Sequence, residues 1–211
     1  MAGQMENIAE SLIAGKVDEV AKLTKEALDA GASADEVMNK GLFGGMEVVS
    51  TKFKNCEMFI PEVLRCAKAM HAAMDVLRPV LTESGGYGAG TVVLATVEGD
   101  LHDIGKNLAG MMLQGAGFNV INMGVDQKSE AIIHAVKEHN PNIVGLSALL
   151  TTTMPKMAET IEALKEAGLR EKVKVIIGGA PVTQEFADEI GADAYAANAA
   201  LGTEKAQALV K

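Results

Sequence analysis

Residues 91–105 read TVVLATVEGDLHDIG, and this stretch decides the fold of the second half of the chain. It opens on an unbroken run of apolar and β-branched residues, turns through a short polar segment, and enters the helical pattern of residues 105–114. An apolar strand followed at once by a helix is typical of a parallel sheet that is covered on both faces. The stretch therefore predicts the first unit of an α/β domain.

The same strand character returns downstream, each time before a segment of helical pattern. Apolar strands that alternate with helices predict a doubly wound parallel sheet of about five strands, in a flavodoxin-like or Rossmann-like order. The further strands are expected at residues 119–123, 143–147 and 173–177, with a weak last strand at 192–195, and the helices at 129–139, 154–167 and 184–190 and after the last strand.

Upstream of residue 91 the pattern is helical throughout. Gly31 suits the end of a helix, Ser33 followed by Glu36 suits a capping box, and Pro61 suits a first helical turn. Four helices joined by short connections predict an antiparallel four-helix bundle. They are expected around residues 8–13, 17–28, 33–49 and 61–79, with the last helix stopped near Pro79.

The segment between the two halves reads TESGGYGAG over residues 82–90 and is the most glycine-rich of the chain. Such composition is typical of a flexible linker. We therefore expect a bundle domain at residues 1–83, a linker at 84–90 and the α/β domain at 91–211. The linker would give the bundle freedom to move.

Composition and charge exclude several classes of protein. A formal net charge of −9 disfavours nucleic-acid binding, which needs basic surfaces. No apolar run reaches the roughly 20 residues of a membrane span, and the start MAGQMENIAE lacks the features of a signal peptide. Cys56 and Cys66 have a spacing that would put them on different faces of a helix, so we expect reduced thiols and a cytoplasmic location.

In open α/β sheets, ligands bind at the carboxyl ends of the strands. The loop after the first strand places His102 between Asp100 and Asp103. An imidazole can bind a metal through one nitrogen while the other donates to a carboxylate, and Asp100 could be that carboxylate. The alternative is a solvated loop in which Asp103 caps the next helix.

Two further strand ends offer features that suit a ligand. Ser147 and the hydroxyls of residues 151–153 could bind a buried polar group, although one threonine could simply cap the following helix. Gly178 and Gly179 would let a ligand approach the backbone, although a tight turn would also explain them. Together these strand ends offer a His–Asp pair, a cluster of hydroxyl groups, and two adjacent glycines. This combination suits a large ligand that carries a metal and a long polar tail. The sequence lacks the HExxH, GxxxxGK[ST], GxSxG and GxGxxG motifs.

Three short segments carry a family resemblance. Residues 100–105 (DLHDIG), 147–149 (SAL) and 178–179 (GG) resemble the DxHxxG…SxL…GG signature of cobalamin-binding domains, in the right order and at the expected strand ends. The helical half resembles the cap module of methionine synthase and of the small corrinoid proteins of methylamine, methanol and methoxy-aromatic methyltransferase systems. That likeness is carried by Phe53-Lys54, by residues 59–62 (FIPE) and by Ala69-Met70.

The resemblance implies a role for each matching residue. His102 would replace the cofactor's own base as the lower ligand of cobalt, the base-off/His-on arrangement, and Asp100 would bind the other nitrogen of His102. Thr153 stands where the family has a hydroxyl that completes this relay. The remaining residues would hold the nucleotide tail. The full implied set is Asp100, His102, Asp103, Ile104, Gly105, Ser147, Leu149, Thr151, Thr153, Gly178 and Gly179, with His102 as the metal ligand.

The resemblance also implies a function. The cofactor would be cobalamin or a related corrinoid, methylcobalamin in the loaded state, and the chain would be a carrier without catalysis of its own. It would take a methyl group from a methyltransferase specific for methylamine, betaine, methanol or a methoxy-aromatic compound (an O-demethylase system). A second methyltransferase would pass that group to a tetrahydrofolate or thiol acceptor, and a reductive activase is a further expected partner. The bundle would shield the cofactor, with Phe53, Phe59, Met46 and Met70 as candidates for its inner face or for the bundle core.

Other readings of the same residues predict different proteins. Adenosylcobalamin light sensors add a DNA-binding domain, and cobalamin-dependent mutases add a substrate barrel; we expect neither in this acidic chain. A flavodoxin-like regulatory module would give the histidine loop no role, and such a protein would stay colourless after incubation with cobalamin.

Overall fold

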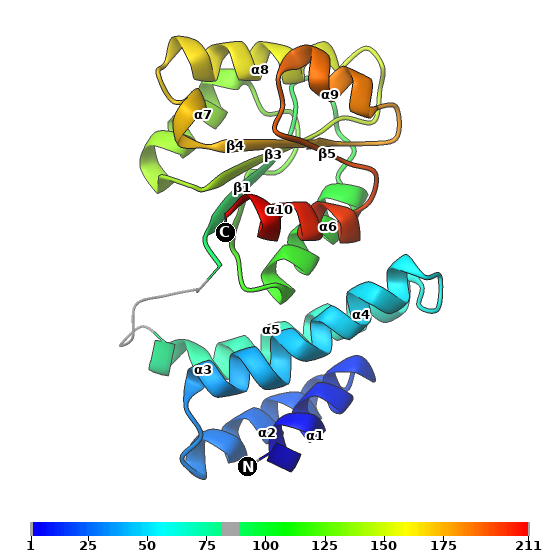
Figure 1. Cartoon of the computed structure of the whole chain (residues 1–211), viewed down its shortest axis with the longest axis vertical. Coiled ribbons are helices and arrows are strands. Elements are labelled where there is room, and N and C mark those ends of the chain that lie inside the picture. Colours follow the sequence, from blue (N-terminus) through cyan, green and yellow to red (C-terminus); the bar gives the residue numbers. More distant parts are fainter. Residues whose placement is uncertain (1, 82–88, 211) are drawn as a thin grey trace. The chain divides into compact units, whose positions relative to one another are not determined.

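The computed structural model describes residues 2–81 and 89–210 (Figure 1). Contacts divide these residues into two compact units, one built chiefly from residues 2–81, with residues 115–117, and the other from the rest of residues 89–210. Each unit buries an apolar core of its own. Most of the predicted linker lies outside the described residues, since only Ala89 and Gly90 of it are described.

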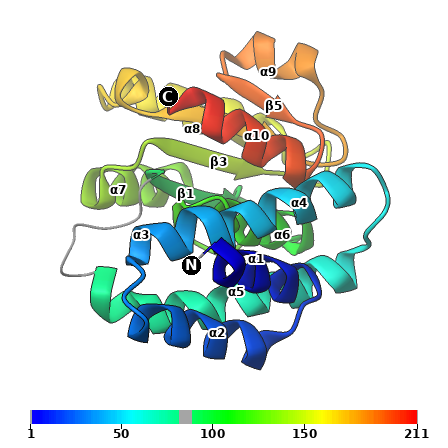
Figure 2. The ribbon, with the colours of Figure 1, turned by 60° about the horizontal axis from the view of Figure 1, so that its bottom comes forward.

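Within residues 2–81, the predicted four helical segments are all present, and the predicted helical half is confirmed (Figures 1 and 2). The third segment is composite, because a π-helical stretch interrupts it. The first helix packs against the second and third segments, and the second packs along the fourth. The segments are α1 (Ala2–Ile13), α2 (Val17–Asp29), the composite of α3 (Ala34–Glu36), η1 (Val37–Phe43) and α4 (Gly44–Lys54), and α5 (Ile60–Leu81).

Local chemistry explains where these helices begin and end. Gly31, with φ +90°, follows the end of α2 in the left-handed region that favours glycine. The Ser33 hydroxyl accepts a hydrogen bond from the Glu36 amide at 3.1 Å and so caps the third segment. The Glu36 carboxylate binds the Lys40 ammonium at 2.8 Å, one turn further on.

The predicted end of the last helix of this unit is wrong. Pro79 lies inside α5, which continues to Leu81. The fixed φ of proline matches a helix, so the ring removes one backbone donor without ending a helix of 22 residues. Cys56 lies in the turn after α4 and Cys66 in α5, and both are free thiols.

The second unit contains five parallel strands in the order β2-β1-β3-β4-β5, which confirms the predicted flavodoxin-like sheet. The order reverses at β1, so the chain builds the sheet outward in both directions. The strands are β1 (Thr91–Thr96), β2 (Asn119–Asn122), β3 (Ile143–Ser147), β4 (Lys174–Gly178) and β5 (Ala194–Ala196).

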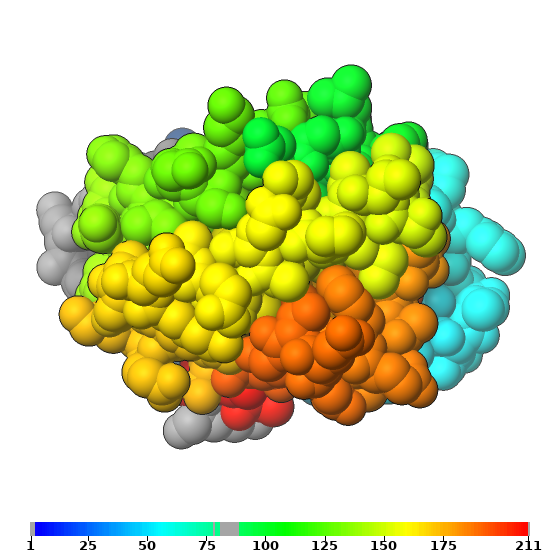
Figure 3. Space-filling model, turned by 90° about the horizontal axis from the view of Figure 1, so that it is seen from above, coloured from blue at the N-terminus to red at the C-terminus, as the bar shows by residue number. Residues whose placement is uncertain are grey.

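Helices cover both faces of this sheet. In Figure 1, α7, α8 and α9 lie on one face, and α6 and α10 lie on the other. Figure 3 looks onto α7, α8 and α9 from outside, where each lies beside the next. The helices are α6 (Ile104–Gly115), α7 (Ser129–His139), α8 (Pro155–Glu166), α9 (Gln184–Ile190) and α10 (Ala199–Leu209), with a 3-10 turn, η2 (Arg170–Lys172).

The two faces of the sheet differ in how they are filled. Val144 and Val175 point to the face of α7, α8 and α9, where they join a core that contains Ile161 and Leu164, all of them fully buried. Side chains alternate between the two faces along a strand, so the neighbouring positions, such as Gly145, lie on the face of α6 and α10. Large side chains thus fill one face, while the other keeps open space. Among the described residues, no helix has both the length and the apolar character that a membrane crossing requires.

Candidate functional site

The carboxyl ends of β1, β3 and β4 meet at one edge of the sheet. Thr96 pairs with Ser147, and Ser147 pairs with Gly178, so the loops that follow these three strands lie together. This arrangement brings the three sequence segments singled out above to one place. Asp100, in the first of these loops, is fully buried there.

Asp100 is the centre of a dense hydrogen-bond network. One carboxylate oxygen, Oδ1, accepts from the His102 amide at 3.0 Å and contacts His102 Nδ1 at 2.8 Å. The other, Oδ2, accepts from the Leu149 amide and from the Thr153 hydroxyl, each at 2.7 Å, and from the Leu150 amide at 3.3 Å. Burial by itself raises the pKa of Asp100, but these donors outweigh it and hold the pKa well below its usual range. The carboxyl group is therefore ionised although it is buried.

This network selects the tautomer of a neutral His102 ring. An ionised carboxylate only accepts hydrogen bonds, so Nδ1 must carry the proton and donate it. Nε2 of the neutral ring then keeps its lone pair, on a side chain that is 51% exposed. The Thr96 hydroxyl donates to the His102 carbonyl at 3.0 Å and holds the backbone of the loop. The ring thus offers one oriented metal donor, with a carboxylate behind it.

Thr153 does not cap the following helix, which was the alternative that the sequence left open. Its hydroxyl donates to Asp100 and contacts the Leu150 carbonyl at 2.9 Å, while Met154 takes the capping position of α8 without a side-chain hydrogen bond. Thr151 is exposed and does not line the cavity described next. Of the two predicted threonines in this loop, Thr153 binds the carboxylate that contacts the histidine, and Thr151 lies outside the cavity.

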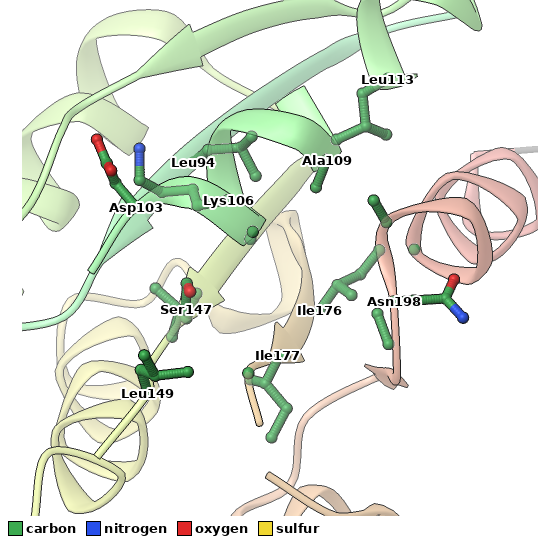
Figure 4. Close-up of a pocket in the computed structure, with 18 of the residues that line it drawn as sticks. Leu94, Asp103, Lys106, Ala109, Leu113, Ser147, Leu149, Ile176, Ile177 and Asn198 are labelled. Carbon is green, nitrogen blue, oxygen red and sulfur yellow. The ribbon is translucent and has the colours of Figure 1, made fainter. Parts of the chain in front are cut away.

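A cavity of about 530 Å³ opens beside His102, between the sheet and helices α6 and α10 (Figure 4). Its lining includes most of the predicted site residues: His102, Asp103, Ile104, Gly105, Ser147, Leu149, Gly178 and Gly179. A volume in this range suits a ligand of the size of a nucleotide. The predicted residues at three strand ends therefore border one cavity.

Small residues make room for this cavity. Gly145 stands in the middle of β3, where a Cβ atom would run into the Leu94 side chain. Gly178 ends β4, where a Cβ atom would lie 2.9 Å from the Ala196 carbonyl oxygen. Alanines on α6 and α10, such as Ala109, replace the larger side chains that cover the opposite face. The open space follows from this choice of residues.

Gly179 allows the loop after β4 to pack closely against the loop after β3. Its φ of +137° lies in a region that other residues rarely adopt. A Cβ atom at this position would overlap the carbonyl group of Ala148, whose amide donates to the Gly178 carbonyl at 3.2 Å. Glycine at 179 therefore lets the loop after β4 lie directly on the loop that carries Leu149.

A polar cluster around the buried Lys106, at the edge of the cavity, was not predicted from the sequence. Lys106, only 4% exposed, donates to Asn107 Oδ1 at 3.0 Å and to Asn122 Oδ1. Burial lowers the pKa of this lysine. Asn107 in turn donates to the Asp103 carboxylate at 2.8 Å. The signal was present in the sequence, because Asn122 stands at the carboxyl end of a strand.

Comparisons with known proteins agree with this geometry. A family model described as a B12 binding domain matches residues 90–203, and a second model with the same description matches residues 4–78. The chain belongs to the B12-binding corrinoid protein family. It is 44% identical over 198 residues to a corrinoid protein from Desulfitobacterium hafniense (strain Y51), with 92% of each chain covered. It is 43% identical to dimethylamine corrinoid protein 1 from Methanosarcina acetivorans, which covers 98% of this chain and 97% of that one.

Solved structures give the same assignment. A cobalamin-binding protein from Desulfitobacterium hafniense DCB-2 has a TM-score of 0.81 and 37% identity, with 98% of each chain covered. A methanol:cobalamin methyltransferase complex from Methanosarcina barkeri contains a chain with a TM-score of 0.87 and 31% identity. This match covers 99% of the present chain and 80% of that chain. Both matches span the helical and the α/β halves of this corrinoid protein.

The Thr153→Val substitution should destabilise the protein. Valine keeps the shape of threonine but removes the hydroxyl donor from the buried Asp100 carboxylate. The expected loss in the free energy of unfolding is about 1–3 kcal/mol, measured by chemical denaturation. Thr152→Val, at an exposed position of the same loop, is the control and should change stability by less than about 0.5 kcal/mol. Equal stability of the two variants would contradict a role for the Thr153 hydroxyl in holding Asp100.

The Gly179→Ala substitution should cost about 2 kcal/mol or more, because it adds backbone strain and a contact with the Ala148 carbonyl. Gly105→Ala is the matched control, since a Cβ atom there meets no heavy atom within 4 Å and alanine favours the helix. Thermal or chemical unfolding of both variants measures the difference. The close packing of the two loops would be disproved if Gly179→Ala were as stable as Gly105→Ala.

Proposed function

We propose that this corrinoid protein binds its cofactor with His102 as the lower ligand of cobalt, and that it carries a methyl group between two methyltransferases. The observation that carries the proposal is the contact of His102 Nδ1 with the buried Asp100 carboxylate, on a half-exposed ring beside a nucleotide-sized cavity. One protein nitrogen suits a metal whose other ligands come from a macrocycle, as in haem proteins. The residues present therefore fit a corrinoid in the base-off/His-on form.

The chain's own residues would bind the cofactor in two places. Exposed apolar side chains around the histidine would pack against the flat macrocycle: Leu101, Ile104, Leu149 and Leu150, which are 71%, 78%, 42% and 42% exposed. The cavity beside them would receive the nucleotide tail, with Gly105 leaving space at its entrance and with Ser147, Gly178 and Gly179 in its wall. Apolar groups left in water at a ligand site favour contact with an apolar partner.

The Asp100 network would tune the histidine. A carboxylate behind a ligating imidazole makes the ring a stronger donor and fixes its direction. Leu149 and Thr153 hold Asp100 in place, so the carboxylate cannot follow the ring if the ring moves away from the metal. When bound, the corrinoid itself supplies the chemistry, since its cobalt accepts a methyl group and gives it up again.

The partners are proposed from the relatives. Relatives are named as dimethylamine and trimethylamine corrinoid proteins, and a similar chain lies in a methanol:cobalamin methyltransferase complex. We therefore propose a donor methyltransferase specific for methylamine, betaine, methanol or a methoxy-aromatic compound. A second methyltransferase would act on a tetrahydrofolate or thiol acceptor, a reductive activase would restore the reduced cofactor, and the system would be cytoplasmic. The cap role of residues 1–83 and the linker role of residues 84–90 stay predictions.

Reconstitution with cobalamin tests the binding site. The apoprotein should take up cobalamin and give an absorbance spectrum in which the cofactor's own base has left the metal. His102→Ala should lose the imidazole coordination and bind at least about tenfold more weakly, a loss of roughly 1.4 kcal/mol. His134→Ala is the matched control, because this histidine is 80% exposed on α7 and should not change the spectrum. The proposal fails if the dimethylbenzimidazole stays on cobalt in the wild-type protein, or if no corrinoid binds.

A labelling experiment tests the carrier role on the same protein. Reduced holoprotein is mixed with radiolabelled methyl iodide, a chemical methyl donor, and is then separated by gel filtration. Label should elute with the holoprotein at about one methyl group per corrinoid. The apoprotein controls for alkylation of Cys56 and Cys66. If holoprotein and apoprotein retain the same amount of label, the chain binds the cofactor without carrying a methyl group on it.

A further inference from the structure

The cavity beside His102 changes from polar to apolar along its length. Residues of the strands that face it run from Ser147 at the carboxyl end of β3, through Gly145, to Ile143 at the start of that strand. With about 3.3 Å per residue, the cavity wall on β3 spans about 13 Å. Leu94 and Val92 on β1 accompany this wall towards the same inner end.

The two covering helices repeat this gradient. Both follow a strand, so their first residues lie near the entrance and their later residues lie deeper. Lys106 of α6 and Asn198, the cap of α10, are polar and lie near the entrance, whereas Leu113 and Ala206 line the interior. Figure 4 shows Leu113 and Ala109 at a distance from Asp103 and from the amine of Lys106.

The residues that line the inner end of the cavity have few free hydrogen-bond donors or acceptors for a polar ligand atom. The side chains there are aliphatic, and the backbone groups of Val92, Val93 and Ile143 take part in the ladders of β1 with β2 and β3. A donor or acceptor placed there would leave water without gaining a partner. Such a loss weakens binding on the order of ten- to a hundredfold for each group.

We propose that this chain selects its corrinoid by the chemistry of the lower base. The inner end takes a flat aromatic base without exocyclic hydrogen-bonding groups, such as a dimethylbenzimidazole, and discriminates against a purine such as adenine. The inference rests on the proposed function, since it assigns the cavity to the nucleotide tail. The phosphate and ribose of that tail stay near the polar entrance.

Three corrinoids that share one macrocycle test the proposal by equilibrium dialysis against the full-length apoprotein. They are cobalamin, the analogue with adenine as lower base, and cobinamide, which lacks the nucleotide. Cobalamin should bind at least about tenfold more tightly than the adenine analogue. Equal affinities for the two, or a preference for adenine, would overturn the proposal, as would cobinamide binding as tightly as cobalamin.

Two variants test whether the aliphatic lining is the cause. Val92→Thr and Ile143→Thr each place a hydroxyl at the inner end, so the preference for cobalamin over the adenine analogue should fall several-fold in at least one of them. Val175→Thr is the control, because it makes the same change on the opposite, packed face of the sheet, and it should leave the preference unchanged. If neither variant lowers the preference, the lining is not its cause and the proposal is overturned.

The outcomes separate this inference from the proposed function. If all three corrinoids bind equally and His102→Ala still changes the spectrum of bound cobalamin, the base preference is wrong while the histidine site stands. If none of the three binds, the proposed function fails and the inference fails with it.

Discussion

The buried carboxylate of Asp100 is the interaction on which the site depends. It accepts hydrogen bonds from its own loop, through His102, and from the loop after β3, through Leu149 and Thr153. Those bonds keep the group ionised where burial alone would favour the neutral acid. The negative charge then selects the tautomer of a neutral His102 ring in which Nδ1 carries the proton. In that tautomer Nε2 has a lone pair that can bind a metal. A single side chain therefore positions two loops and His102, the proposed metal ligand.

The parallel sheet supports this arrangement because one of its faces carries a packed core and the other borders a cavity. The face under α7, α8 and α9 is filled by large aliphatic side chains and supplies the rigid core. The other face has Gly145 and several alanines, and it keeps a cavity that begins at the histidine and ends among aliphatic residues. The proposed ligand, with a metal at one end and a long tail, would occupy both parts. In this proposal, one face of the sheet stabilises the fold and the other binds the ligand.

Much of the fold could be predicted from the sequence, because apolar runs and helical periodicity are local signals. The ranges of α7 and α9 agree with the predicted residues 129–139 and 184–190. Local rules failed at Pro79, where a long helix tolerates the ring. They also missed the pairing of Lys106 with Asn122, since residues 16 apart in the sequence meet only after the sheet has formed. Thr151 and Thr153 could not be told apart before their loop was placed.

The sequence by itself determined the α/β and helical halves, the strand ends that carry polar residues, and the motif that names the family, because each of these is written in neighbouring residues. The tertiary structure decided which atoms meet. Asp100 and Thr153 stand 53 residues apart, and their 2.7 Å hydrogen bond exists because β1 and β3 are adjacent in the sheet. The ionisation of Asp100, the tautomer of His102 and the polarity gradient of the cavity all follow from that adjacency, since desolvation and hydrogen bonding depend on neighbours in space.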